Sequence, residues 1–288
     1  MKRRKVWLGL GTAVLVSSQV GANDGAPSAD IAMSAASHRH GTALGHGGAM
    51  LVAAARGSGE GGEGDEGGKA ADYDANLAPA LRFYRDIELI RGHLLVGDEL
   101  VREKRWAEAL PHFLHPSEEI YGKIRNDLKT YGVAPFLSAL KALAQTVKAK
   151  NEAAYRTAFA AMEERLGPAD KGVRAKEENW PSFAVDTVLE MLRTATNEYE
   201  EAIEKGRIAK PVEYQDSRGF VWEAEKLLGS VADELGKKDA EAVKAAQAGF
   251  AELKKAWPTA VPPKTPAKDV SQVLADISKI ELQLGRFR

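Results

Sequence analysis

Residues 92–121 read GHLLVGDELVREKRWAEALPHFLHPSEEIY and hold both the pattern and the polar groups that decide how the chain is interpreted. Apolar residues recur at spacings of three and four, which is typical of amphipathic helices. Three of the chain's six histidines lie here, and two carboxylates follow within one helical turn: His93, His112, His115, Glu118 and Glu119. Because the chain has no cysteine, a site for a borderline metal must use imidazole and carboxylate groups. The stretch predicts a helical protein with such a metal site.

The helical pattern extends from Ala71 to the C-terminus. Gly and Pro fall at the ends of segments, and runs of β-branched residues are missing. We therefore predict an all-α fold, with Asn151 and Asp239 as helix N-caps. The expected helices span about 72–104, 135–149, 151–166, 181–205, 211–235, 239–256 and 269–285. A further helical segment follows the first helix, is interrupted near Pro111 and Pro116, and ends near residue 130.

Two parts of this helical region resemble copies of one unit. The block that starts at Glu103 can be laid on the block that starts at Glu204 without gaps. We therefore predict two duplicated up-and-down helical bundle units, at 71–168 and 179–288.

This alignment sets His112 against Glu213 and His115 against Asp216. Either the two units share a polar pocket whose side chains diverged, or both positions are unconstrained surface turns. Glu213, Asp216 and Arg218 form a possible second polar site, although clusters of this kind are more often structural ion pairs.

Residues 1–22 have the features of a secretory signal peptide. A basic start, Lys2 to Lys5, precedes an apolar run from Val6 to Val16, and Val20-Gly21-Ala22 resembles a cleavage site. The apolar run is shorter than the roughly 17–25 residues of a transmembrane helix, and no later stretch is long and apolar enough. We expect an exported protein without a transmembrane segment, located in the periplasm.

Residues 23–70 are dominated by Gly, Ala and Ser, a composition that cannot bury enough apolar area to fold. We predict a disordered linker. It carries His38, His40 and His46, which either bind metal weakly and pass it on or are solvated without a role.

The charge balance argues against a nucleic-acid partner. Removing residues 1–22 takes four of the 40 basic residues and none of the 41 acidic ones, so the net charge falls from −1 to about −5. Nucleic-acid binders usually carry a basic excess on one face.

Two interpretations of the histidine motif stay open. The run from His115 to Glu119 has the form of a helix start, with Pro116 at the first position, so the histidines can be incidental. Alternatively, an antiparallel return after the first helix brings His112 and His115 back to the level of His93. Imidazole and carboxylate at this spacing suit Zn, Cu(II), Fe or Ni.

A secreted, cysteine-free helical chain with duplicated bundles and a His/Glu motif resembles the imelysin-like proteins over roughly 72–288. Their motif is G-x-H-x-x-E, and here His115 and Glu118 keep H-x-x-E while Phe113 stands where the family has Gly. The resemblance implies a periplasmic or surface protein associated with iron uptake, with His115 and Glu118 as the metal pair.

Three functions fit these observations. The first is a metal-binding protein for iron or copper acquisition, with Fe, Cu or Zn as the bound ion. The second is a structural module that binds another envelope protein. The third is a metal-dependent hydrolase or an oxidoreductase. No G-x-S-x-G, H-E-x-x-H or Ser/His/Asp order is present, so we favour the non-catalytic functions.

Overall fold

Helices make up most of the part of the chain that the computed structural model describes, residues 76–288. All of these residues belong to one compact unit, Gly62–Arg288. The all-α prediction is confirmed. The predicted signal peptide and linker, with His38, His40 and His46, lie outside the described residues.

The first half of the described chain contains α2 (Pro79–Arg102), α3 (Trp106–His115), a π-helical turn (Pro116–Ile120), α4 (Tyr121–Ile124), a 3-10 turn (Leu128–Tyr131), α5 (Leu137–Lys148) and α6 (Glu152–Arg174). The second half contains α7 (Trp180–Ala202), a hairpin of β1 (Ile203–Glu204) and β2 (Arg207–Ile208), α8 (Pro211–Leu253), a 3-10 turn (Lys254–Ala256), α9 (Val270–Leu284) and a final 3-10 turn (Gly285–Phe287).

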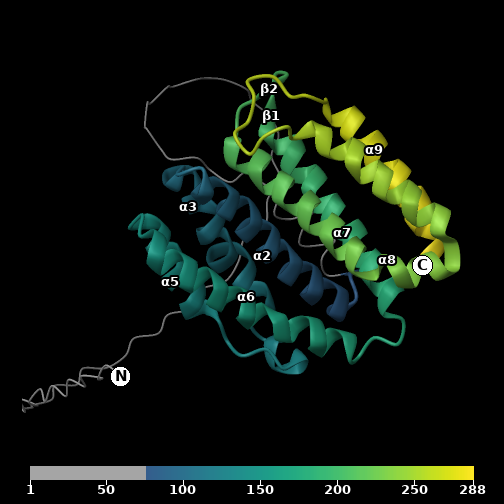
Figure 1. Ribbon diagram of the computed structural model, residues 1–288, viewed down its shortest axis with the longest axis horizontal. Helices are drawn as coiled ribbons and strands as arrows, with labels where there is room; N and C mark the ends of the chain where they lie inside the picture. Colours follow the sequence, from purple (N-terminus) through teal and green to yellow (C-terminus); the bar gives the residue numbers. More distant parts are fainter. Residues whose placement is uncertain (1–75) are drawn as a thin grey trace, which may run out of the picture. The chain divides into compact units, whose positions relative to one another are not determined.

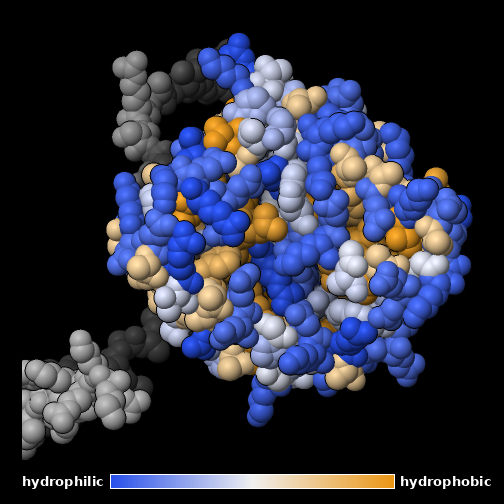
Figure 2. Space-filling model, in the orientation of Figure 1, coloured by the Kyte–Doolittle hydropathy of each residue, from blue (hydrophilic) through white to orange (hydrophobic). Residues whose placement is uncertain are grey.

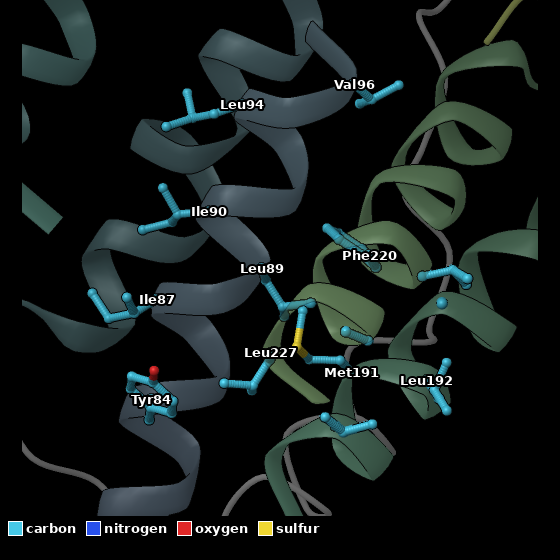
Figure 3. Close-up of a cluster of buried hydrophobic side chains, with 14 of the residues drawn as sticks. Tyr84, Ile87, Leu89, Ile90, Leu94, Val96, Met191, Leu192, Phe220 and Leu227 are labelled. Atoms are coloured by element: carbon cyan, nitrogen blue, oxygen red, sulfur yellow. The ribbon is translucent and has the colours of Figure 1, made fainter. Parts of the chain in front are cut away.

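Helix α2 runs through the middle of this unit, with α3, α5 and α6 on one side and α7, α8 and α9 on the other (Figure 1). Figure 3 shows the consequence for its side chains: Ile87 and Leu94 point to one side, while Leu89 points towards Phe220 and Met191 on the other. A helix that is buried on most sides in this way forms the centre of a core.

The two predicted bundle units are therefore packed against each other through α2, α7 and α8. Their origin by duplication and the proposed boundaries stay predictions. The segment after residue 168, which separates the two predicted units, is helical as far as Arg174, because α6 continues through Pro168. Ala169 and Val173 are buried beyond the proline, and the packing of this apolar face favours continuation of the helix.

The predicted N-caps are confirmed. The Asn151 side chain accepts a hydrogen bond from the Ala154 N–H at 3.1 Å. Asp239 leaves the helical conformation inside α8 (φ −156°, ψ 92°) and accepts from the Ala242 N–H at 3.0 Å. These side chains bond N–H groups that have no partner in the first turn of a helix.

Within residues 76–288, no helix combines the length and the apolar character of a membrane span.

Candidate metal centre

The centre of the site is the carboxylate of Asp216 on α8, on which three imidazoles converge. Its Oδ1 lies 2.7 Å from His93 Nδ1 and 2.7 Å from His112 Nδ1, and its Oδ2 lies 3.1 Å from His115 Nδ1. Asp216, His93 and His112 are buried, whereas the side chain of His115 keeps 24% of its exposure. The site therefore reaches the surface on the His115 side.

The three histidines come from the two helices that the sequence placed antiparallel. His93 lies on α2, where the edge of its ring packs against Phe220 of α8 with centroids 4.9 Å apart. His112 and His115 lie in the last turn of α3. The rings of His93 and His115 are 5.4 Å apart and nearly perpendicular. The predicted convergence of the histidines is present, and Asp216 from the second half of the chain is what joins them.

The chain after His115 does not begin a new α-helix with Pro116 at its first position. It continues from α3 into the π-helical turn Pro116–Ile120, a local widening that is frequent at functional sites. Glu119 Oε1 lies 3.8 Å from His115 Nε2, while Glu118 lines a surface pocket with Ser117 and Lys141. The turn directs one carboxylate to the histidines and the other towards α5.

His112 differs from the other two histidines because both of its ring nitrogens lie within hydrogen-bond distance of an oxygen acceptor. Nδ1 faces Asp216, and Nε2 lies 2.9 Å from Gln215 Oε1. The amide nitrogen of Gln215 donates to the Ala260 carbonyl at 3.1 Å, which leaves the amide oxygen to accept from His112.

Burial opposes the ionisation of Asp216, but the three histidines around it outweigh this cost and hold the pKa of its carboxyl well below the usual range. For His115, burial lowers the pKa, whereas the hydrogen bond and the charge of Asp216, with smaller contributions from Glu119 and Glu198, raise it to about 9. The metal-free site is thus held together by an ionised carboxylate and its imidazole partners.

Glu198 of α7 is a site residue that the sequence analysis did not single out. Burial raises its pKa to about 8, and the nearby carboxylates of Asp216, Glu201, Glu213 and Glu119 add to this. The periodicity of the helix places position 198 on its core side, because it shares a face with the buried Met191, Ala195 and Ala202 at spacings of three and four.

The atoms of His93, His115 and Asp216 that can bind a metal all lie within 4.8 Å of one another, and no other group of this kind occurs in the described part of the chain. Two ligands about 2.1 Å from one ion and at right angles to each other are roughly 3 Å apart. The N···O distances of 2.7 and 3.1 Å from Asp216 to His93 and His115 therefore suit a shared ion. His112 and Glu118 are not members of this group.

The side chains of the possible second polar site do not gather at one place in the structure. Asp216 faces the histidines, whereas Arg218 points elsewhere: it holds both oxygens of Glu99 at 2.8 and 3.0 Å and donates to the Trp257 carbonyl at 2.7 Å. Its guanidinium also lies over the ring of Trp222, 3.9 Å from the centroid. Glu213 acts on the site only through its charge near Glu198.

A cavity of about 1200 Å³ forms a groove lined by residues of α2, α6, α7 and α8. Figure 2 shows hydrophilic side chains gathered in the hollow between α6 and α8. Its floor contains the buried carboxyls of Glu88 and Glu223. Arg91 pairs with Glu88 and Asp170, and Lys226 pairs with Glu223. Because these charges already satisfy one another, the groove is a weaker candidate than the histidine centre.

Residues 174–287, less than half of the chain, match a family model described as the iron permease-associated 4-helix bundle domain. The matched segment contains α7, α8 and α9, and with them Glu198, Gln215 and Asp216, but none of the three histidines. No curated protein and no solved structure matches the chain significantly.

This match corrects two expectations. The resemblance to the imelysin-like proteins is wrong, since the matching family is a different helical bundle. That resemblance rested on H-x-x-E, and Glu118 of this pair faces α5. The periplasmic location is also not supported, because the matching domain is associated with permeases, which are membrane transport proteins. The all-helical bundle and the link to iron agree with the sequence analysis.

Proposed function

We propose that this chain binds an iron ion as cargo at His93, His115 and Asp216, in support of an iron permease. The observation that carries the proposal is the convergence of these three residues, whose ligand atoms lie within 4.8 Å of one another. The permease connection rests on the matching family, the iron permease-associated 4-helix bundle domain.

The donor set suits iron. Two imidazoles and one carboxylate, with positions left open, are the ligands of many non-haem Fe(II) sites. Glu119 and Glu198 add two more carboxylates near the ligands, and hard oxygen donors suit iron better than Cu(I), which prefers sulfur. Three protein ligands also leave room for water or for a group from a partner, which suits an ion that must be released.

The opening of the site fits cargo exchange. His115 is the ligand that keeps partial exposure, and the Glu119 side chain beside it is 56% exposed. An ion that enters from the surface meets these two side chains before it reaches Asp216, which is only 4% exposed. The acidic groups near the opening attract cations and raise their local concentration.

The test is iron binding by the full chain. His38, His40 and His46 are first replaced by Ala so that the linker histidines cannot contribute. Fe(II) is titrated without oxygen, with Zn(II) and Cu(II) in parallel, and bound metal is measured by elemental analysis and by the melting temperature. We expect one Fe(II) per chain and a higher melting temperature, since a ligand that binds only the folded state stabilises it.

The variants His93→Ala/His115→Ala and Asp216→Asn are expected to lose this ion, and Glu200→Gln, an exposed carboxyl of α7, is expected to keep it. Absence of bound iron in the unsubstituted site, or equal binding after removal of both histidines, would contradict the proposal.

A second candidate function is docking to a partner protein, which the words "permease-associated" favour. Leu274 and Leu282 of α9 are the large apolar side chains that stand exposed in the described residues, at 45% and 72%. If α9 is the contact, Leu282→Ser should weaken co-purification with the permease and leave iron binding unchanged.

A further inference from the structure

We propose that His112 is a positioning residue of the iron site and not one of its ligands; this inference rests on the proposed function. It holds the Asp216 carboxylate in the orientation in which both His93 and His115 contact it. It also connects the site, through Gln215, to the loop that follows α8. The sequence analysis placed His112 among the ligands, so this assignment gives it a different role.

The first argument is the hydrogen bonding of the ring. Both nitrogens of His112 face oxygen acceptors, Asp216 Oδ1 at 2.7 Å and Gln215 Oε1 at 2.9 Å. His93 and His115 each use only Nδ1 for a hydrogen bond within residues 76–288. A metal ligand needs a lone pair on nitrogen in place of its N–H. Through Nδ1, His93 or His115 would exchange one hydrogen bond to Asp216 for the metal, whereas His112 would also break the link between Asp216 and Gln215.

The second argument is position. The atoms of His93, His115 and Asp216 form one group within 4.8 Å, and His112 lies outside it. Its ring centroid is 6.4 Å from that of His115, and its side chain is fully buried. An ion that enters from the surface meets the partly exposed His115 before it can reach His112.

The third argument is the anchoring of Gln215. Its amide nitrogen donates to the Ala260 carbonyl at 3.1 Å, in the loop between α8 and α9. Ala260 and Gln215 are both buried, so the chain of contacts from Ala260 through Gln215 and His112 to Asp216 is shielded from water. Partners of this kind behind a metal ligand fix its orientation, and their loss typically weakens metal binding about 10–100-fold.

The experiment compares His112→Asn with His112→Leu in the full chain without linker histidines. An asparagine amide nitrogen lies near the position of imidazole Nδ1 and can still donate to Asp216, whereas leucine cannot. We expect His112→Asn to bind Fe(II) within about threefold of the unsubstituted site and His112→Leu to bind roughly 10–100-fold more weakly. Equal binding by His112→Leu would overturn the positioning role.

X-ray absorption at the iron edge, at saturating Fe(II), separates a positioning residue from a ligand. The number of imidazole ligands is expected to stay the same in both His112 variants and to fall by one in His93→Ala. One imidazole fewer in His112→Asn would show that His112 is a ligand and would overturn the inference.

If the unsubstituted site binds no iron, the iron proposal itself has failed. A measurement without metal then still tests the link from His112 to Gln215. Melting temperatures are compared for His112→Leu, Gln215→Leu and the double variant. Because the two side chains share a buried hydrogen bond, the double variant should lose less than the sum of the single losses. Additive losses would overturn the link through Gln215.

Discussion

Gly92 of α2 and Gly219 of α8 lie in backbone contact, where the two central helices cross. A Cβ atom at Gly219 would lie 2.3 Å from the Gly92 carbonyl oxygen, and a Cβ at Gly92 would lie 3.1 Å from the Gly219 carbonyl. His93 follows the first glycine directly, and Asp216 lies one helical turn before the second. The close approach of these glycines therefore sets the distance between an imidazole and the carboxylate at the centre of the site.

The first prediction is that Gly219→Ala destabilises the chain and weakens iron binding together. The added methyl group meets backbone, which cannot move without separating α2 from α8, and overpacking of this kind costs about 1–3 kcal/mol. Gly229→Ala is the matched control, because it lies in the same helix with nothing within 4 Å of its Cβ position. There the higher helix propensity of Ala should stabilise by about 0.5–1 kcal/mol.

Urea unfolding and Fe(II) titration of both variants check this prediction. If Gly219→Ala unfolds at the same urea concentration as the unsubstituted protein and binds iron equally well, the crossing does not set the site.

Glu198→Gln is expected to weaken iron binding about tenfold, or 1.4 kcal/mol. The substitution keeps the size of the side chain and removes a carboxyl near Asp216 that a bound cation would ionise, so a negative charge that attracts the ion in the iron-bound state is lost. Glu200→Gln removes the same charge from an exposed position on the same helix and should have little effect. Calorimetric titration is the suitable measurement, since loss of a carboxyl whose pKa burial raises to about 8 also changes the melting temperature without metal. Equal affinities for the two variants would argue against a role for Glu198.

The π-helical turn yields a third prediction, on two adjacent carboxylates. Glu119 faces His115 and Glu118 faces α5, so Glu119→Gln should weaken Fe(II) binding and Glu118→Gln should not. The effect is expected to be small, roughly two- to fivefold, because Glu119 is exposed and exposed charge pairs contribute about 0.2–1 kcal/mol. A larger effect of Glu118→Gln in the same titration would mean that this turn is an ordinary α-helical turn in solution.

The sequence predicted those features that depend on residues close together in the chain. The spacing of apolar residues predicted the helices, and the number of residues between His93 and His112 was enough for an antiparallel return that brings them together. The role of Asp216 was not predictable in this way, because it depends on the packing of α8 against α2, and sequence spacing does not encode contacts between distant helices. The proposed alignment equated His115 with Asp216, and the structure brings these two side chains together at 3.1 Å.

Glu118 and Glu198 show two further reasons why the site could not be predicted fully from the sequence. A regular helix would have kept Glu118 near His115, and only the π-helical turn directs it away. Glu198 lay on the core face of its helix by period, yet its charge and its two acidic neighbours, Glu200 and Glu201, suggested a solvated surface. A partly buried carboxylate with a raised pKa on the core side of a helix is a feature typical of functional sites.

The last prediction concerns Glu88, at the floor of the groove and away from the histidines. Burial raises the pKa of Glu88 to about 7. Arg91 opposes this change, whereas the charges of Glu223 and Asp170 add to it. In the unfolded chain the pKa is near its usual value of 4.5. Between these two values the folded protein binds more protons than the unfolded chain, so the free energy of unfolding falls as pH rises from about 4.5 to 7 and stays level above. The loss is about 3 kcal/mol, at 1.36 kcal/mol per pKa unit.

Glu88→Gln removes this titration, and Arg91 keeps both oxygens of Asp170 as partners at 2.7 and 2.9 Å. The variant should therefore lack the Glu88 part of the decline and gain stability relative to the unsubstituted protein as pH rises from 4.5 to 7. Urea unfolding at pH 5, 6, 7 and 8 measures the difference, and Glu281→Gln, an exposed carboxyl of α9, is the control that should follow the unsubstituted protein. If the stability curves of Glu88→Gln and Glu281→Gln are parallel across this range, Glu88 is ionised in the folded protein throughout, and water reaches the floor of the groove more freely than its burial indicates.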